Sequence, residues 1–200
     1  MSMRKRLFDA VLAGAGLLML APLLLLVALL IKLDSSGPVF FRQERVGRGG
    51  QPFRIHKFRT MRAEQCNIGP QITVGRDPRI TRVGHVLRSS KLDELPQLID
   101  VLQGTMSLVG PRPEVPRYVA LYPADLRDKI LSVRPGITDI ASIEYRDESA
   151  VLARALDPEH AYVHEVLPRK LALSARYVDQ ASVWTDMVLI GRTLWAIVRR

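Results

Sequence analysis

The run from Val11 to Ile31 constrains this chain more than any other feature, because its 21 residues include no charged side chain. About 20 consecutive apolar residues match the hydrocarbon core of a bilayer, so a membrane helix is the primary interpretation. Basic residues precede the run, as in a secretory signal, but the run is too long for one and no small-residue cleavage site follows. We therefore expect a retained membrane segment.

Two features of this run favour a re-entrant helix over a single membrane-spanning helix, which is the alternative. Pro22 lies in the middle, and a proline inside a helix bends or breaks it. Two arms of about ten residues, each about 15 Å long, would reach about half of the hydrocarbon depth. Both flanks are basic, and the positive-inside tendency would keep both on the cytoplasmic side. The flanking charges are Arg4, Lys5 and Arg6 before the run and Lys32, Arg42, Arg45 and Arg48 after it, against Asp34 and Glu44.

The charge balance predicts an anionic partner, because the formal net charge is +9 at pH 7. Nucleic acid, phosphorylated small molecules and acidic lipid are the candidate classes. The apolar run and the lack of a recognisable nucleic-acid-binding module argue against nucleic acid. Cys66 is the only cysteine, which excludes a disulfide framework and a cysteine-based metal cluster. A chain of 200 residues is long enough to form one domain with its own hydrophobic core.

The segment Ser89–Pro113 carries two adjacent carboxylates, Asp93 and Glu94. We expect a helix to begin near Asp93, because Pro96 is tolerated in a first turn, where N–H groups have no intrahelical partner. Free amides and the positive dipole end favour an anion there, and two carboxylates beside an anion call for a divalent metal. The alternative is that Asp and Glu are simply common first-turn residues. Apolar residues recur at helical spacing: Leu92, Leu95, Leu98, Ile99 and Leu102.

Residues 37–62 predict two short strands, Val39–Phe41 and Phe53–Phe58, joined by a turn rich in glycine and proline. Lys57 and Arg59 have two interpretations that the residues leave open. They contact a membrane surface, or they bind the phosphates of a nucleotide.

The rest of the chain predicts a surface loop and a series of short elements. His56 and His85 are isolated and are expected to be packed or exposed rather than metal ligands. The last helix combines Trp and Arg with apolar residues, which suits a membrane interface, with packing on the core as the alternative. The expected elements are a loop at Ala63–Asp77, helices at Val115–Leu131, Pro158–Val178 and Val183–Arg200, and a strand at Ile137–Tyr145.

In order and spacing, these segments resemble the small monotopic phosphoglycosyl transferases, the bacterial sugar transferases that load a sugar phosphate onto polyprenyl phosphate. The resemblance covers nearly the whole chain. It rests on RLFDAVLAGAGLLMLAPLLLL, GPVFFRQERVG, FRIHKFRTM, RSSKLDELPQLIDVLQGTMSLVGPRP and VRPGIT.

The resemblance implies a fold and an activity. The fold is a small, mostly α, α/β cytosolic domain over residues 37–200 with interfacial amphipathic helices, preceded by a re-entrant membrane helix over residues 1–36. Members transfer a sugar 1-phosphate from a UDP-sugar to undecaprenyl phosphate and release UMP, which starts an exopolysaccharide, capsule, lipopolysaccharide O-antigen or glycoprotein glycan. The implied location is the cytoplasmic face of the bacterial inner membrane. The implied partners are the two substrates, membrane lipid and downstream glycosyltransferases.

The resemblance also implies roles for individual residues. Asp93 would be the nucleophile that forms an aspartyl phosphosugar, Glu94 would support a Mg²⁺ ion, and Pro22 would bend the membrane helix. Arginine between or beside prolines is held at little entropic cost and can clamp phosphate oxygens bidentately. The residues expected to bind substrate are Arg112 and Arg134, with Lys57, Arg59 and Arg88 as further candidates.

The chain departs from the family pattern at two places. Ala21-Pro22 stands where Ser-Pro is frequent, and alanine has no hydroxyl to satisfy a freed backbone carbonyl. After Arg134-Pro135-Gly136-Ile137-Thr138, many members continue Gly-Trp-Ala-Gln-Val, whereas residues 139–146 here read DIASIEYR, so the substrate sugar stays open. The lack of a multi-span N-terminal region predicts the minimal form of the family. A membrane-anchored scaffold without enzymatic activity is the competing hypothesis, and it predicts no dependence on Asp93.

Overall fold

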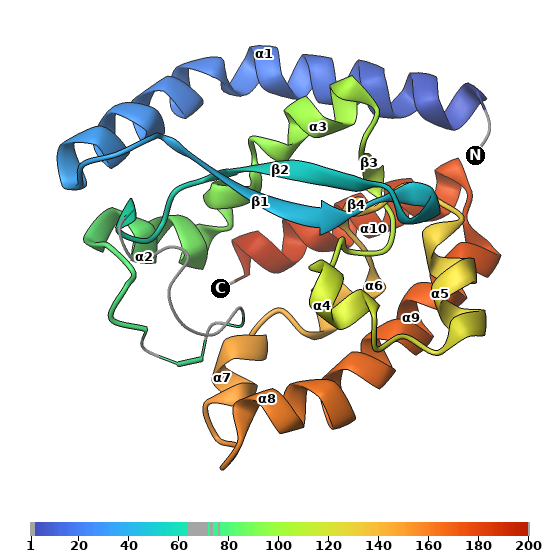
Figure 1. Ribbon diagram of the computed structural model, residues 1–200. Helices are drawn as coiled ribbons and strands as arrows, with labels where there is room; N and C mark the ends of the chain where they lie inside the picture. The colour runs from blue at the N-terminus through green and yellow to red at the C-terminus, as the bar shows by residue number, and fades with distance from the viewer. Residues whose placement is uncertain (1–2, 64–71, 73, 76, 200) are drawn as a thin grey trace.

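The structure is a computed structural model that describes residues 3–63, 72, 74–75 and 77–199. A long helix, α1, lies along one side of the molecule, with α3 and a two-stranded ribbon packed beneath it (Figure 1). The shorter helices from α4 to α9 lie on the side away from α1, and α10 crosses between the two regions. The expected small, mostly helical α/β fold is confirmed.

Helix α1 (Met3–Asp34) is one continuous helix of 32 residues that contains Pro22. It arches over the domain and does not fold back on itself (Figure 1). Pro22 therefore does not break it, because a long helix of strong helix formers survives the loss of one hydrogen bond, at about 3 kcal/mol. A bend that returns the chain to the same membrane face is not seen within α1, and the re-entrant arrangement stays a prediction.

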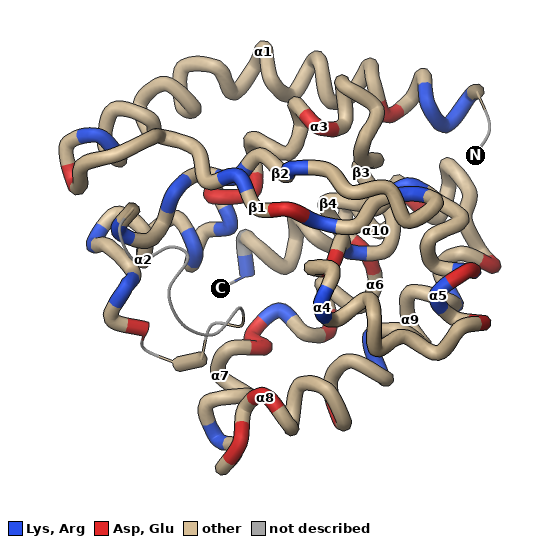
Figure 2. The backbone as a smooth tube through the Cα atoms, in the orientation of Figure 1, with Lys and Arg blue, Asp and Glu red and all other residues tan. Residues whose placement is uncertain are grey.

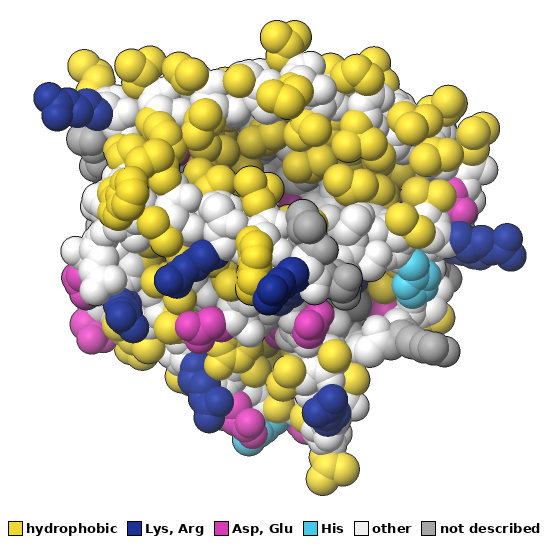
Figure 3. Space-filling model, turned by 180° about the vertical axis from the view of Figure 1, so that it is seen from behind, with side chains coloured by type: hydrophobic (Ala, Val, Ile, Leu, Met, Phe, Trp, Pro, Cys, Tyr) yellow, Lys and Arg dark blue, Asp and Glu magenta, His cyan; other side chains and the backbone are white. Residues whose placement is uncertain are grey.

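Among the described residues, α1 is the helix that is long and apolar enough to cross a membrane. Only 11% of its most apolar window is buried, whereas the core helix of a soluble protein is mostly buried. Ala13 and Val27 pack against the domain, while Leu18 and Met19 are 81% and 78% exposed. Figure 3 shows hydrophobic side chains concentrated along α1 and just below it. This unburied apolar surface indicates membrane association.

The expected hairpin is confirmed, with a first strand longer than expected. Strand β1 (Phe40–Val46) pairs antiparallel with β2 (Pro52–Phe58), and η1 (Arg48–Gly50) forms the turn. Gly49 and Gly50 adopt φ of 66° and 78°, a region that glycine enters without steric penalty. The ribbon packs on α3, which places the side chain of Lys57 toward the residues that precede α3.

A second, parallel pair joins β3 (Ser107–Val109) to β4 (Gly136–Thr138). The two backbones meet so closely at their ends that a Cβ on Gly136 would lie 2.1 Å from the amide nitrogen of Gly110. Glycine is therefore required there, and the close approach fixes the direction of the chain that carries Arg112.

Two sequence predictions in this region are wrong. The expected strand at Ile137–Tyr145 ends at Thr138, because Asp139 caps a helix, α6 (Ile140–Glu144), by accepting a 2.7 Å hydrogen bond from the amide of Ser142. The expected single helix at Val115–Leu131 is two helices, α4 (Pro116–Val119) and α5 (Ala124–Leu131). Pro123 interrupts it, since the residue before a proline is disfavoured in helical conformation.

The two helices expected near the C-terminus are confirmed, and a membrane-interface role of the last one stays a prediction. The expected helix at Pro158–Val178 is one helical run that widens to a π-turn before Pro168, whose nitrogen cannot donate to the preceding turn. The last helix packs Leu189 on Val109 and Tyr177, while Trp184 and Trp195 are 71% and 59% exposed, so it has both a core face and an open apolar face. The elements are α8 (Pro158–Ala161), η4 (Tyr162–Val166), α9 (Leu167–Gln180) and α10 (Val183–Val198), preceded by α7 (Glu148–Leu152).

Helix α2 (Arg82–Ser90) begins at Thr81, whose hydroxyl accepts a hydrogen bond from the amide of Gly84. The loop expected at Ala63–Asp77 falls largely outside the described residues. Figure 2 shows few charged residues along α1 between its ends and a concentration of them where β1, β2 and α2 meet. The candidate site lies in that charged region.

Candidate active site

The adjacent carboxylates lie on a 3₁₀ turn, η3 (Leu92–Glu94), that precedes α3 (Gln97–Gln103). The prediction that the α-helix begins near Asp93 is therefore wrong by about one turn. Glu94 N and Leu95 N donate to carbonyls three residues earlier, at 3.3 and 3.2 Å. Pro96 has no N–H for the next hydrogen bond, so regular α-helical bonding begins only after it.

Asp93 is 2% exposed and keeps one oxygen unpaired. Its Oδ2 lies 2.9 Å from Lys57 Nζ, whereas its Oδ1 is buried without a hydrogen-bond partner among the described residues. A buried carboxylate oxygen without a partner is destabilising, so its retention suggests a use outside folding. The lone pairs of Oδ1 are thus available for another partner.

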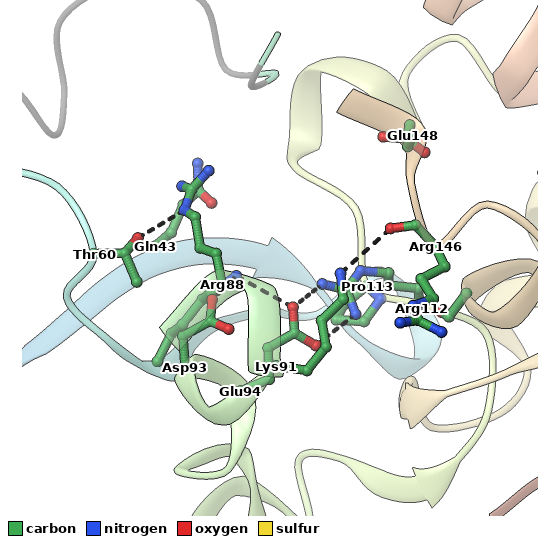
Figure 4. Close-up of polar contacts among 12 residues, drawn as sticks. Gln43, Thr60, Arg88, Lys91, Asp93, Glu94, Arg112, Pro113, Arg146 and Glu148 are labelled. Atoms are coloured by element: carbon green, nitrogen blue, oxygen red, sulfur yellow. Dashed lines mark hydrogen bonds and ion pairs between the residues drawn. The ribbon is translucent and has the colours of Figure 1, made fainter. Parts of the chain in front are cut away.

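Glu94 is held by two cations. Arg112 approaches it as a fork, with Nη1 2.9 Å from Oε2 and Nη2 bonded to Oε1, and Lys57 Nζ lies 3.2 Å from Oε1. Figure 4 shows Glu94 and Arg112 facing one another. Burial opposes ionisation of Glu94, but the charges of Arg112 and Lys57 outweigh it and hold the pKa of Glu94 well below its usual range. Glu94 therefore stays ionised at neutral pH, and its stabilising contribution is lost only as pH falls through that lowered pKa.

Arg88 and Lys91 extend the positive charge around the pair. Arg88 Nε donates to Thr60 Oγ1 at 2.9 Å, and its pKa is lowered by burial, partly offset by the charge of Asp93. Lys91 Nζ lies 3.5 Å from the carbonyl of Arg146, and burial lowers its pKa as well. Lys91 is the non-glycine residue with positive φ, 59°, in the described part of the chain. With Lys57 and Arg112, these residues surround two carboxylates with four cationic side chains, which is suited to binding a phosphorylated ligand.

The structure does not bring Arg59 and Arg134 into this cluster. Arg59 is 2% exposed and bonds the carbonyls of Ser35 and Ser36, so it caps the end of α1. Arg134 Nε donates to the carbonyl of Gly104 at 2.6 Å. The contacts shown for both residues are structural, and substrate binding by them stays a prediction.

His56 is buried and His85 is exposed, which are the two arrangements expected for these isolated histidines. Sequence reasoning missed the partner of His56. Asp100 Oδ1 lies 2.6 Å from His56 Nδ1, and Asp100 Oδ2 accepts the backbone amide of His56 at 2.8 Å. It also missed Lys91 and Gln97, for which no local sequence signal exists.

A magnesium ion fits the donor set of the site. No group of three or more His, Cys, Asp or Glu side chains gathers anywhere in the described ranges, so a protein-only cage is not available there. Magnesium instead favours one or two carboxylates completed by water and substrate phosphates. A carboxylate has about four acceptor positions, and Arg112 and Lys57 occupy three of those on Glu94, which leaves one for a metal.

Comparison with known proteins decides the family. The family described as bacterial sugar transferase matches residues 1–200. This chain belongs to the bacterial sugar transferase family. A relative from Caulobacter vibrioides, named UDP-glucose:undecaprenyl-phosphate glucose-1-phosphate transferase, is 40% identical over 205 residues, covering 96% of this chain and 68% of the relative.

Two further relatives of this sugar transferase are longer proteins. An Escherichia coli K12 protein with the same name as the Caulobacter relative is 39% identical, over 96% of this chain and 39% of the relative. An Aeromonas hydrophila protein, named UDP-N-acetylgalactosamine-undecaprenyl-phosphate N-acetylgalactosaminephosphotransferase, is 37% identical, over 97% of this chain and 43% of the relative. The chain thus spans about two fifths of these two relatives. The relatives are named for one phosphotransferase reaction with different sugars.

Proposed function

We propose that this chain transfers a sugar 1-phosphate from a UDP-sugar to undecaprenyl phosphate and releases UMP, as the first step of a surface glycan such as an exopolysaccharide. The observation that carries the proposal is the buried Asp93, with one free oxygen, beside Glu94 and four cationic side chains. The names of the relatives in the same family support the substrate classes.

Asp93 supplies the nucleophile in this proposal. One of its carboxylate oxygens attacks the β-phosphorus of the UDP-sugar, the bond from that phosphorus to the bridging oxygen breaks, and UMP leaves with the electron pair. The product on the protein is an aspartyl phosphosugar. A phosphate oxygen of undecaprenyl phosphate then attacks the same phosphorus, and the electron pair of the broken aspartyl bond returns to Asp93. Neither displacement needs a proton, and the intermediate divides one difficult transfer into two.

The cationic side chains bind and orient the phosphates. Before the donor binds, Lys57 pairs with both Asp93 and Glu94, and Arg112 pairs with Glu94. In this proposal both cations then offset the negative charge of the diphosphate during transfer. Arg88 and Lys91 add charge at the same site. Glu94 would hold Mg²⁺, which, when bound, offsets the charge of the diphosphate and improves UMP as a leaving group.

The mass of the intact protein tests this proposal. The protein is held in nanodiscs with Mg²⁺ and one UDP-sugar at a time, without lipid acceptor, and UMP release is followed in parallel. We expect a mass gain of one phosphosugar with the correct donor, and loss of that gain when undecaprenyl phosphate is added. Activity that appears only with lipid, without any adduct, would contradict the covalent route and favour direct transfer.

Membrane placement gives a second test. We propose that α1 anchors the domain to the cytoplasmic face of the inner membrane, with basic residues at both ends of the helix retained on that side. Tags at both chain ends are expected to be protected from external protease in intact cells. Digestion of the N-terminal tag alone would show a single span and exclude the re-entrant arrangement.

Lys91 connects stability with function. We expect Lys91→Gly to raise the free energy of unfolding by about 1 kcal/mol, because glycine adopts the left-handed conformation without steric cost. We also expect KM for the UDP-sugar to rise by about tenfold, because one cation is lost from the phosphate site. Denaturant unfolding and steady-state UMP release measure the two effects. Lys91→Arg, which keeps the charge and the backbone strain, is the control, and an unchanged KM in Lys91→Gly would exclude Lys91 from donor binding.

A further inference from the structure

Three polar residues form a buried stripe along η3 and α3. Asp93, Gln97 and Asp100 are four and three residues apart on a helical backbone, so their side chains lie on one side. They are 2%, 1% and 1% exposed. Two of the three are paired with β2, Asp93 with Lys57 and Asp100 with His56. The stripe thus faces the ribbon and ends at the proposed nucleophile.

Gln97 lies between these two pairs and has no such partner. Both its Nε2 and its Oε1 are buried without a hydrogen bond to any described residue. Leaving a buried polar group unpaired costs about 1–3 kcal/mol, and an apolar side chain of similar shape would avoid that cost. Folding alone therefore gives no reason for glutamine at this position, which points to a partner that arrives with the substrate or with a change at the site.

The free oxygen of Asp93 is the other unpaired atom on the stripe, one helical turn from Gln97. An amide N–H is a suitable donor to a carboxylate oxygen. In the structure, Asp93 is held by Lys57, which is also shared with Glu94. Lys57 is 23% exposed at its side chain, whereas Asp93 is 3% exposed, so an incoming diphosphate reaches the ammonium group first.

We propose that Gln97 is the positioning residue for the Asp93 nucleophile, in an inference that rests on the proposed function. When the diphosphate draws Lys57 away, Gln97 Nε2 donates to one oxygen of Asp93 and directs the other at the β-phosphorus. A neutral donor suits this role better than a cation. It fixes the carboxylate in place while withdrawing less of the negative charge that makes it nucleophilic.

The test compares Gln97→Leu with the parent in nanodiscs, with the UDP-sugar donor and no lipid acceptor. We expect the midpoint of thermal unfolding to be unchanged or higher, because two unpaired polar groups are removed. We expect adduct formation to slow by about 10- to 100-fold at saturating donor, with KM little changed, because orientation rather than binding is lost. Gln103→Leu, at the exposed end of the same helix, is the matched control and is expected to behave as the parent.

A second variant separates positioning from a structural role. In Gln97→Glu, the new carboxyl can donate to Asp93 only while protonated and repels it once ionised. We expect adduct formation by this variant to fall as pH rises through a range in which the parent rate is constant.

Two results would overturn the inference. The first is a rate of adduct formation in Gln97→Leu that equals that of the parent. The second is a destabilised Gln97→Leu together with a parent-like pH dependence of adduct formation in Gln97→Glu, which would show a structural role. Absence of any adduct in the parent is a different result, because it removes the proposed function itself.

Discussion

Asp93→Asn is expected to form no phosphosugar adduct and to release UMP at least about 10⁴-fold more slowly than the parent. The amide has nearly the same shape as the carboxylate, but it lacks the charge and the nucleophilic oxygen. It also loses the ion pair of 2.9 Å between Asp93 and Lys57. Intact-protein mass and UMP release, with donor and Mg²⁺ present, measure the effect.

A matched control for this substitution is Asp125→Asn, which makes the same chemical change on the exposed first turn of α5. It is expected to leave adduct formation unchanged. An adduct of the same mass in Asp93→Asn would mean that another residue is the nucleophile. Full activity in Asp93→Asn would mean that the Asp-Glu pair only shapes the turn, and a parent without activity toward any donor would favour the scaffold hypothesis.

Glu94→Gln is expected to lower the rate of UMP release by about 10²- to 10³-fold and to weaken its dependence on Mg²⁺ concentration. The substitution removes the carboxylate that accepts two hydrogen bonds from Arg112. It also removes one of the two carboxylates that contact Lys57, the other being Asp93. It also leaves Arg112 without its carboxylate partner in a partly buried site, which is destabilising. Initial rates across a magnesium titration, with unfolding measured on the same preparation, provide the test.

The control for Glu94→Gln is Glu44→Gln. Glu44 is exposed on β1, and its substitution removes one negative charge without affecting the contacts of the cluster. We expect the parent magnesium dependence in this control. If Glu94→Gln also keeps the parent dependence, the metal is held by other groups and Glu94 acts only by positioning Arg112.

Local sequence patterns predicted the elements that depend on neighbouring residues. The uncharged run from Val11 to Ile31 predicted the long helix, and turn glycines between apolar strands predicted the hairpin. The predictions failed where one proline or one cap competes with helical or strand periodicity. Pro96 delays α3, Pro123 divides the helix expected at Val115–Leu131, and Asp139 starts a helix where a strand was expected.

By itself, the sequence determined a long apolar helix, a basic net charge and the Asp93-Glu94 pair within the segments that resemble the family. It could do so because these features are either periodic or formed by residues adjacent in the chain. Tertiary structure alone decided which cations reach the pair. Arg112 meets Glu94 across 18 residues and Lys57 across 37, whereas Arg59 caps α1 and Arg134 bonds the carbonyl of Gly104. It also left Gln97 unpaired between Asp93 and Asp100, each of which is paired with a side chain of β2. The physical reason is that a charged side chain binds the nearest partner in space, and packing between distant segments sets that distance.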